Sequence, residues 1–270
     1  MSFPKYCFGT HFFSSKKKLE ILYYEKILKK CLDKGIFFFD TADQYGNGQS
    51  EKILGNFINK NNLSKKILIS SKVGNLNNFR DSDLQKCIDN ILKRLRIEKL
   101  DILYFHSGTN EQFFNDNFWN IMNKNQKEGK ITKLGLSLKT KYLRLQNLKQ
   151  VKKMREYNID VLCVTHNMLF DYNKLIKKNI PSNVTQISRL PFANGFVFLR
   201  KSLLYYFKLL QNENSYFLNK KNFNILKNIQ KINDFSDKKI MKYCLNYNLK
   251  NFQSVVFSCS NLSQIEKIDF

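Results

Sequence analysis

Four ionisable side chains lie at, or shortly after, the ends of three successive apolar runs. The runs are Ile36–Asp40, Ile67–Ser71 and Leu100–Phe105. The ionisable residues are Asp40, Tyr45, Lys72 and His106. Because the carboxyl ends of parallel strands meet on one face of a barrel, we expect these four residues to line one pocket there.

These residue types suit the protonation of a carbonyl oxygen. A buried lysine beside a tyrosine favours tyrosinate, which lowers the pKa of the phenol toward working pH. A carboxylate near the lysine keeps it charged and oriented, and a histidine can hydrogen-bond a substrate carbonyl. Each residue alone has a plainer interpretation, because a single histidine is more often structural and a single lysine is usually solvated. The prediction therefore rests on the four together.

Alternating strands and helices would position these residues. The expected strands are Tyr6–Thr10, Ile36–Asp40, Ile67–Ser71, Leu100–Phe105, Lys133–Leu136, Val161–Val164, Thr185–Ser188 and Ser254–Phe257. The expected helices are Leu19–Leu32, Ser50–Ile58, Ser82–Leu95, Asn117–Lys127, Tyr142–Tyr157, Tyr172–Lys178, Ser236–Tyr247 and a short last one from Leu262. Strands separated by helices imply parallel βαβ units.

We therefore predict an α/β fold, a (β/α)8 TIM barrel that forms a single domain over residues 1–270. An open doubly wound sheet is the alternative, although no G-x-G-x-x-G motif follows a strand. The aromatic and lysine-rich segment Phe196–Asn222 has no regular pattern, and in a barrel it would lie on the face where active sites form.

Composition and charge argue against several classes of protein. The net charge is +24, but lysine is spread over nearly every segment rather than gathered on one element, which predicts solvated surfaces and no nucleic-acid role. The charge would still attract anionic substrates. The apolar runs are too short to span a membrane, and the N-terminus lacks a signal-peptide pattern, so a cytoplasmic location is expected. The six cysteines form no C-x-x-C pair, and no metal site is predicted.

Several motifs resemble those of the aldo-keto reductase family. They are Asp40–Glu51 with Leu54-Gly55, Ser71–Gly74, Leu95–His106, Gly129–Ile131 and Gly135–Ser137. The resemblance runs from about Phe8 to Ile268. It implies that Asp40, Tyr45, Lys72 and His106 match the family's catalytic tetrad, and that hydride passes from a nicotinamide to a carbonyl carbon while Tyr45 protonates the oxygen.

The resemblance also implies a set of cofactor contacts. They are Gly9, Thr10, Asp40, Ser137, Arg189, Phe192, Asn194, Ser258, Ser260 and Gln264. Arg189 would stack on the nicotinamide face, and the helix start near Ser260 would receive a phosphate through free backbone N–H groups. Lys267 would add charge for a 2′-phosphate. NADP(H) is the expected cofactor, with NAD(H) as the alternative.

The sequence departs from the family pattern at four places. Leu138 replaces an asparagine, Cys163 a glutamine, Phe257-Ser258 a Pro-Gly pair and Lys267-Ile268 a Glu-Asn pair. The family's C-terminal loop, which often shapes the substrate pocket, has no counterpart, and this predicts an open pocket.

Two functions from different classes follow. The first is an NADP(H)-dependent oxidoreductase that reduces a small aldehyde, ketone or sugar-derived carbonyl compound, or catalyses the reverse reaction. The second is a catalytically degenerate barrel that acts as a cofactor- or protein-binding module. The intact tetrad favours the first, and the departures favour the second. The sequence names neither the substrate nor any partner protein.

Overall fold

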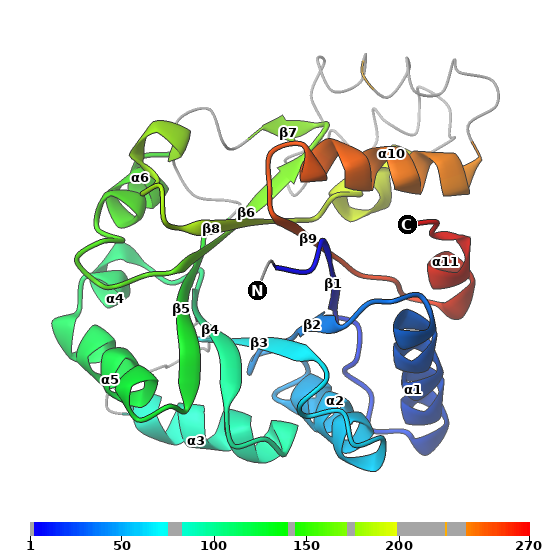
Figure 1. Ribbon diagram of the computed structural model, residues 1–270, viewed down its shortest axis with the longest axis horizontal. Coiled ribbons are helices and arrows are strands. Elements are labelled where there is room, and N and C mark those ends of the chain that lie inside the picture. The colour runs from blue at the N-terminus through cyan, green and yellow to red at the C-terminus, as the bar shows by residue number, and fades with distance from the viewer. Residues whose placement is uncertain (1–2, 75–82, 140–143, 172–175, 199–224, 226–235) are drawn as a thin grey trace.

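The computed structural model describes residues 3–74, 83–139, 144–171, 176–198, 225 and 236–270. Its strands are β1 (Tyr6–Gly9), β2 (Phe38–Asp40), β3 (Leu68–Val73), β4 (Leu100–His106), β5 (Ile131–Ser137), β6 (Val161–Asn167), β7 (Phe170–Asp171), β8 (Thr185–Arg189) and β9 (Ser254–Phe257). Eight of them pair in parallel in the order β5-β4-β3-β2-β1-β9-β8-β6, and pairing of β5 with β6 closes the ring. The predicted barrel is confirmed, and the open sheet is excluded (Figure 1).

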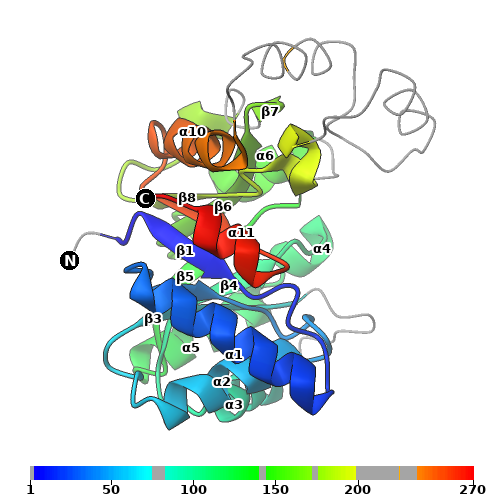
Figure 2. The same cartoon turned by 90° about the vertical axis from the view of Figure 1, so that its right-hand side faces the viewer.

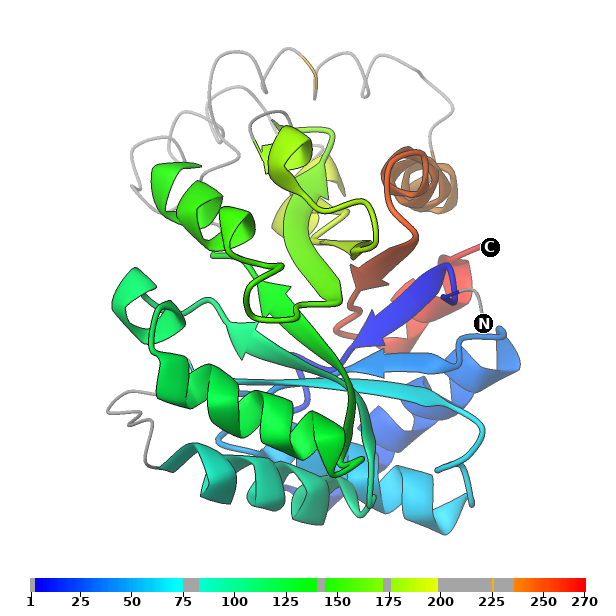
Figure 3. The same cartoon turned by 60° about the vertical axis from the view of Figure 1, so that its left-hand side comes forward.

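Helices surround this ring. They are α1 (Lys18–Asp33), α2 (Gln49–Lys60), α3 (Leu84–Leu95), α4 (Asn110–Phe113), α5 (Asp116–Lys127), α6 (Arg144–Lys152), α10 (Asp237–Leu249) and α11 (Leu262–Lys267), with the 3-10 helices η2 (Lys177–Asn179) and η3 (Ala193–Phe198). In Figure 2, α1 lies beside α11, and in Figure 3 α3 and α5 run along the outside of the strands. The first and last helices therefore lie beside each other, as do the first and last strands of the chain, β1 and β9.

The structure differs from the expected elements at two helices and at one additional strand. Of the helix expected at Tyr142–Tyr157, residues 142 and 143 lie outside the described residues, and the structure has helix α6 as far as Lys152, with turns after it. Residues 172–175 of the expected helix Tyr172–Lys178 lie outside the described residues, and the part that follows contains the 3-10 helix η2. Strand β7 was not expected; it pairs antiparallel with the end of β6. The irregular segment Phe196–Asn222 is described only as far as Phe198.

Most strands of the barrel alternate between two apolar environments. On β4, Ile102 and Tyr104 belong to a small interior cluster, whereas Leu103 and Phe105 belong to the large core that includes the helices. The same alternation separates Phe38 from Phe39 on β2. A period of two is the pattern of a strand with both faces buried. Short apolar runs therefore fill the barrel and its outer shell together.

This period places polar side chains inside the barrel mouth. Asp40 lies two residues after the interior Phe38, and His106 lies two residues after the interior Tyr104. Lys72 is the register partner of Tyr104 on the neighbouring strand. His106 on β4 is the register partner of Ser137 on β5, and Ser137 is the register partner of Cys163 on β6. Strand alternation and register thus direct one ring of polar residues to the carboxyl end of the barrel.

Candidate active site

The Lys72 ammonium is the centre of the polar ring. Its Nζ lies 2.5 Å from Asp40 Oδ2, 2.6 Å from the Thr41 carbonyl oxygen and 3.4 Å from the Tyr45 hydroxyl. Lys72 is 2% exposed, so this contact with Asp40 is a buried ion pair. Burial alone would lower the pKa of Lys72, but the Asp40 carboxylate and the Tyr45 hydroxyl raise it, and the net shift is upward. Lys72 therefore stays charged beside the phenol.

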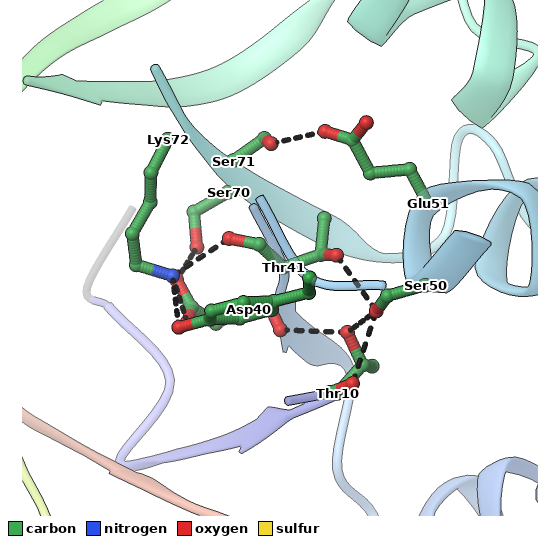
Figure 4. Close-up of polar contacts among 9 residues, drawn as sticks. Thr10, Asp40, Thr41, Ser50, Glu51, Ser70, Ser71 and Lys72 are labelled. Carbon is green, nitrogen blue, oxygen red and sulfur yellow. Dashed lines mark hydrogen bonds and ion pairs between the residues drawn. The ribbon is translucent and has the colours of Figure 1, made fainter. Parts of the chain in front are cut away.

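A network of hydroxyl groups fixes the Asp40 end of this arrangement (Figure 4). Ser70 Oγ donates to Asp40 Oδ1 at 2.7 Å. Ser50 Oγ lies 2.6 Å from Thr10 Oγ1 and 3.0 Å from Thr41 Oγ1, and it donates to the Thr10 carbonyl oxygen at 3.0 Å. The start of α2 is thereby tied to the ends of β1 and β2. These hydroxyl partners were not expected from the sequence.

Thr10 is the one predicted cofactor contact that lies outside the cavity described below. Its side chain is fully buried, and its hydroxyl donates to the Asp40 carbonyl oxygen at 3.1 Å. The hydroxyl is satisfied by the strand ends, so Thr10 positions Asp40 rather than facing a ligand. Direct contact of Thr10 with a cofactor stays a prediction, because a Gly-Thr pair in sequence does not show which of the two residues faces the cavity.

A second buried polar cluster lies behind Lys72. The Glu51 carboxylate is fully buried; it accepts from Ser71 Oγ at 2.5 Å and pairs with Arg94 Nε at 2.6 Å. Asp43 is 4% exposed, and neither of its carboxyl oxygens has a hydrogen-bond partner of good geometry among the described residues. Burial and the Glu51 carboxylate raise the pKa of Asp43 to about 7, against smaller opposing effects that include Arg94. The loop between Asp40 and Tyr45 therefore contains a carboxyl group that titrates near neutral pH.

Two imidazoles flank the Tyr45 ring edge to face. The His106 ring centroid lies 6.1 Å from that of Tyr45, and the His11 centroid lies 4.8 Å from it. Burial, with the charges of Lys72 and Arg189, holds the pKa of His106 well below its usual value. At neutral pH His106 is consequently an uncharged imidazole, which can hydrogen-bond a carbonyl oxygen but has little capacity to protonate it.

One cavity of about 640 Å³ joins these groups to the loops after β8 and β9. The predicted residues that line it are Asp40, Tyr45, Lys72, His106, Gly9, Ser137, Arg189, Phe192, Asn194, Ser258, Ser260 and Gln264. Residues that sequence reasoning missed also line it, including His11, Phe12, Gln44, Lys139 and Phe198. Most of these lie in the loop that follows a strand, so the rule that βα loops build the site could have found them.

The inner part of the cavity has polar groups that fit a bound ligand. Ser137 Oγ and His106 Nδ1 are buried and have no hydrogen-bond partner among the described residues. Gly9 permits a close approach, because a Cβ there would lie 2.6 Å from Ser258 Oγ. Arg189 Nη2 donates to the Leu138 carbonyl oxygen at 2.6 Å. A cavity of this size with a few unsatisfied polar groups can hold a small-molecule ligand.

The loop after β9 differs from what its sequence predicts. The backbone N–H groups expected to be free are already bonded, since Ser260 N donates to Gln264 Oε1 at 2.8 Å and Leu262 N donates to Tyr23 Oη at 2.8 Å. Lys267 pairs with Asp237 at 3.4 Å and is not a cavity residue. The phosphate site therefore stays a prediction, and a phosphate that binds to these two N–H groups would have to displace the Gln264 and Tyr23 side chains.

The loop after β8 has an uncommon backbone. Leu190, Ala193 and Asn194 have φ values of 59°, 47° and 54°, and Gly195 has a φ of 87°. Left-handed conformations cost energy at residues with a Cβ, so the fold must hold them in place. Asn167 Nδ2 donates to the Leu190 carbonyl oxygen at 3.0 Å and fixes the start of this loop. Conformational strain is thus concentrated at the cavity wall.

Within the described ranges, no cluster of three or more His, Cys, Asp or Glu side chains could hold a metal ion. No helix in the described part of the chain is long and apolar enough to cross a membrane.

Comparisons with known proteins agree with the geometry. An aldo-keto reductase of Gibberella moniliformis is 40% identical over 88 residues, 30% of this chain and 27% of that protein. A Schizosaccharomyces pombe aldo-keto reductase whose name includes NADP(+) is 29% identical over 141 residues, 48% of this chain and 40% of that protein. These matches thus span less than half of the relatives' own length.

A solved structure, a glycerol dehydrogenase from Gluconobacter oxydans, has the same fold. Its TM-score is 0.75 at 19% identity, and the match covers 97% of this chain and 84% of that one. The sequence model of the Aldo/keto reductase family matches residues 5–268, nearly the whole chain. The chain therefore belongs to the aldo/keto reductase family.

Proposed function

We propose that this protein is an NADPH-dependent reductase of aldehydes or ketones, with Tyr45 as the proton donor. One observation carries the proposal: the Lys72 ammonium contacts the Asp40 carboxylate and the Tyr45 hydroxyl inside a cavity that His106 also lines. Family membership supports an oxidoreductase that acts on carbonyl compounds. The NADP(+) in the name of the fission-yeast relative supports NADPH over NADH.

Each residue of the proposed site has a distinct task. A bound nicotinamide would supply the hydride that adds to the carbonyl carbon, and Ser137 and Arg189 are the residues that would hold its ring. Negative charge then develops on the carbonyl oxygen, and the Tyr45 hydroxyl gives it a proton. Lys72 stabilises the resulting tyrosinate, since its ammonium lies 3.4 Å from the phenol oxygen. Asp40 holds that ammonium in place.

His106 orients the substrate in this proposal. Its imidazole is uncharged at neutral pH because burial and nearby cations lower its pKa. A neutral imidazole can donate a hydrogen bond to the carbonyl oxygen without competing with Tyr45 as the acid. The assignment of the proton to Tyr45 follows from this difference.

The alternative is a degenerate barrel that binds a cofactor or a protein without turnover. The occupied donors at Ser260 and Leu262 favour it, because a phosphate would have to displace the Gln264 or Tyr23 side chain. The departures from the family pattern at Leu138 and Cys163 also favour the degenerate barrel. The ordered contacts among Asp40, Lys72 and Tyr45 favour the enzyme.

The experiment that separates these functions measures binding and turnover in the same preparation. Calorimetric titration with NADPH and with NADH gives the two affinities, and a panel of small aldehydes is then tested by loss of NADPH absorbance. The proposal expects tighter binding of NADPH and reduction of at least one aldehyde. Binding of cofactor without reduction of any aldehyde supports the degenerate barrel, and tighter binding of NADH contradicts the cofactor assignment.

A further inference from the structure

Tyr45 must regain a proton after every turnover of the proposed reaction. Its hydroxyl gives a proton to the carbonyl oxygen, and the alcohol that leaves carries this proton away. A tyrosinate is left behind. Before the next turnover, one proton from solvent must therefore reach the Tyr45 oxygen.

Two ionisable neighbours of Tyr45 are poorly suited to collect this proton. Lys72 is 2% exposed, and its pKa is raised despite burial because of Asp40 and Tyr45, so it keeps its own proton. His106 is 8% exposed, and burial together with nearby cations keeps its imidazole uncharged at neutral pH. Both groups are enclosed, and neither exchanges protons with solvent readily.

His11 also lies beside Tyr45, but it is exposed to solvent. It follows β1 by two residues and lines the same cavity. Its ring centroid lies 4.8 Å from that of Tyr45, with an angle of 82° between the ring planes. Rings this close are in contact, so an imidazole nitrogen can exchange a proton with the phenol oxygen directly or through one water molecule. His11 thus connects Tyr45 with solvent.

The charges around His11 favour proton uptake at one stage of the reaction. Burial, and then the charge of Lys72, lower the pKa of His11 below its ordinary value, so the imidazole is mostly uncharged at neutral pH. Lys72 on β3, Tyr45 in the loop after β2 and His106 on β4 are the titratable groups around it. A tyrosinate at Tyr45 would add a negative charge beside the imidazole and raise its pKa. His11 therefore gains affinity for a proton when Tyr45 lacks one.

We propose that His11 returns the proton to Tyr45 after each turnover. An imidazole nitrogen takes a proton from solvent, and the imidazolium then gives a proton to the tyrosinate oxygen. This step restores the phenol and the neutral imidazole, and its net change is the uptake of one proton from solvent. The inference rests on the proposed reductase function and adds a proton-transfer residue to the same site.

The first test compares the first turnover with later ones. His11→Phe keeps an aromatic ring against Tyr45 but removes the titratable nitrogens. When protein loaded with NADPH is mixed rapidly with an aldehyde, its first turnover should match that of wild type, because Tyr45 starts with its proton. Later turnovers should be about 10²-fold slower, the lower end for loss of a positioned proton donor.

Two results of this comparison would overturn the inference while the reductase function stands. One is an equal steady-state rate in wild type and His11→Phe. The other is a raised KM with no difference between first and later turnovers, because His11 would then bind substrate rather than transfer a proton.

The second test is rescue by free imidazole, because slow product release also separates first from later turnovers but does not respond to an added acid. His11→Ala leaves space for imidazole beside Tyr45. Added imidazole should raise the steady-state rate of this variant in proportion to its protonated form, so more at pH 6 than at pH 8. Phe12→Ala is the matched control, because Phe12 is an exposed ring of the same cavity without an ionisable group. Absence of rescue in His11→Ala, or equal rescue in Phe12→Ala, would overturn the inference.

An NMR titration keeps this inference separate from the proposed function, because it requires no turnover. The chain has three histidines, and the signal that His11→Phe lacks is that of His11. The pKa of His11 should lie below 6.5 in wild type and move back toward that value in Lys72→Met. The same pKa in both proteins would overturn the inference. A pKa that responds in a protein that reduces no aldehyde would support the coupling of His11 to the site and fault the reductase proposal alone.

Discussion

Replacement of Asp43 by asparagine should change how the stability of this protein depends on pH. Asp43 is 4% exposed, and burial together with Glu51 raises its pKa from 3.8 to about 7. Charged or titratable groups on the neighbouring elements are Glu51 on α2, Lys72 on β3, and Arg94 and Cys87 on α3. Of these, Arg94 is already paired with Glu51. Ionised Asp43 is therefore poorly compensated.

The sign and size of this pH effect follow from the coupling between proton binding at Asp43 and folding. The folded protein holds the Asp43 proton up to a higher pH than the unfolded chain, so stability falls as pH rises from about 4 to about 7. A shift of about three pKa units corresponds to about 4 kcal/mol, as an upper estimate, once the group is fully ionised. Asp43→Asn removes this loss. Relative to wild type, the variant should gain up to about 4 kcal/mol between pH 4 and pH 8.

Urea unfolding of both proteins across this pH range measures the difference. An asparagine amide without partners adds a constant cost at all pH values, so the slope with pH, rather than the offset, is the informative quantity. Asp33→Asn is the control, because Asp33 is exposed at the end of α1. A parallel pH dependence for wild type and Asp43→Asn would refute the reasoning.

Three further predictions concern the scaffold and the proposed chemistry. Gly135→Ala should lower the free energy of unfolding by about 1–3 kcal/mol, because a Cβ there overlaps the buried Tyr104 ring, and thermal unfolding tests this. Ser50→Ala should cost about 1–2 kcal/mol in urea unfolding and lower turnover, since it releases the hydroxyls of Thr10 and Thr41. In steady-state assays, Lys72→Met should lower kcat, and the double variant with Tyr45→Phe should lose far less than the product of the single losses, because Lys72 acts through Tyr45. Multiplicative losses would show instead that the two residues act independently.

The strands and the four ionisable residues could be predicted from the sequence because they depend on local pattern. Apolar runs at regular spacing predicted the barrel. The position of Asp40 and His106 at strand ends predicted that both lie at the carboxyl end of the barrel. Strand β7 was missed because a two-residue strand has no periodicity to read. The C-terminal end of α6 was placed too late because Lys153, Met154, Arg155 and Glu156 are good helix formers, although they lie in turns.

The satisfaction of polar groups could not be predicted. Whether Ser260 N is free depends on the Gln264 side chain, and whether Thr10 faces a ligand depends on Ser50 from another element. The neutral-pH titration of Asp43 depends on its burial beside Glu51. Each is a property of three-dimensional packing. A sequence motif identifies a residue but not the hydrogen-bond partners of that residue in the folded protein.

Deuterium transfer from NADPH labelled at the transferring carbon tests the central claim most directly. The labelled cofactor and a reduced aldehyde are incubated with wild type and with Tyr45→Phe, and the alcohol is analysed by mass spectrometry. We expect one deuterium on the carbinol carbon, and a rate about 10²–10⁴-fold lower in Tyr45→Phe at unchanged cofactor affinity. Unlabelled alcohol, or labelled alcohol formed equally fast by Tyr45→Phe, would contradict it.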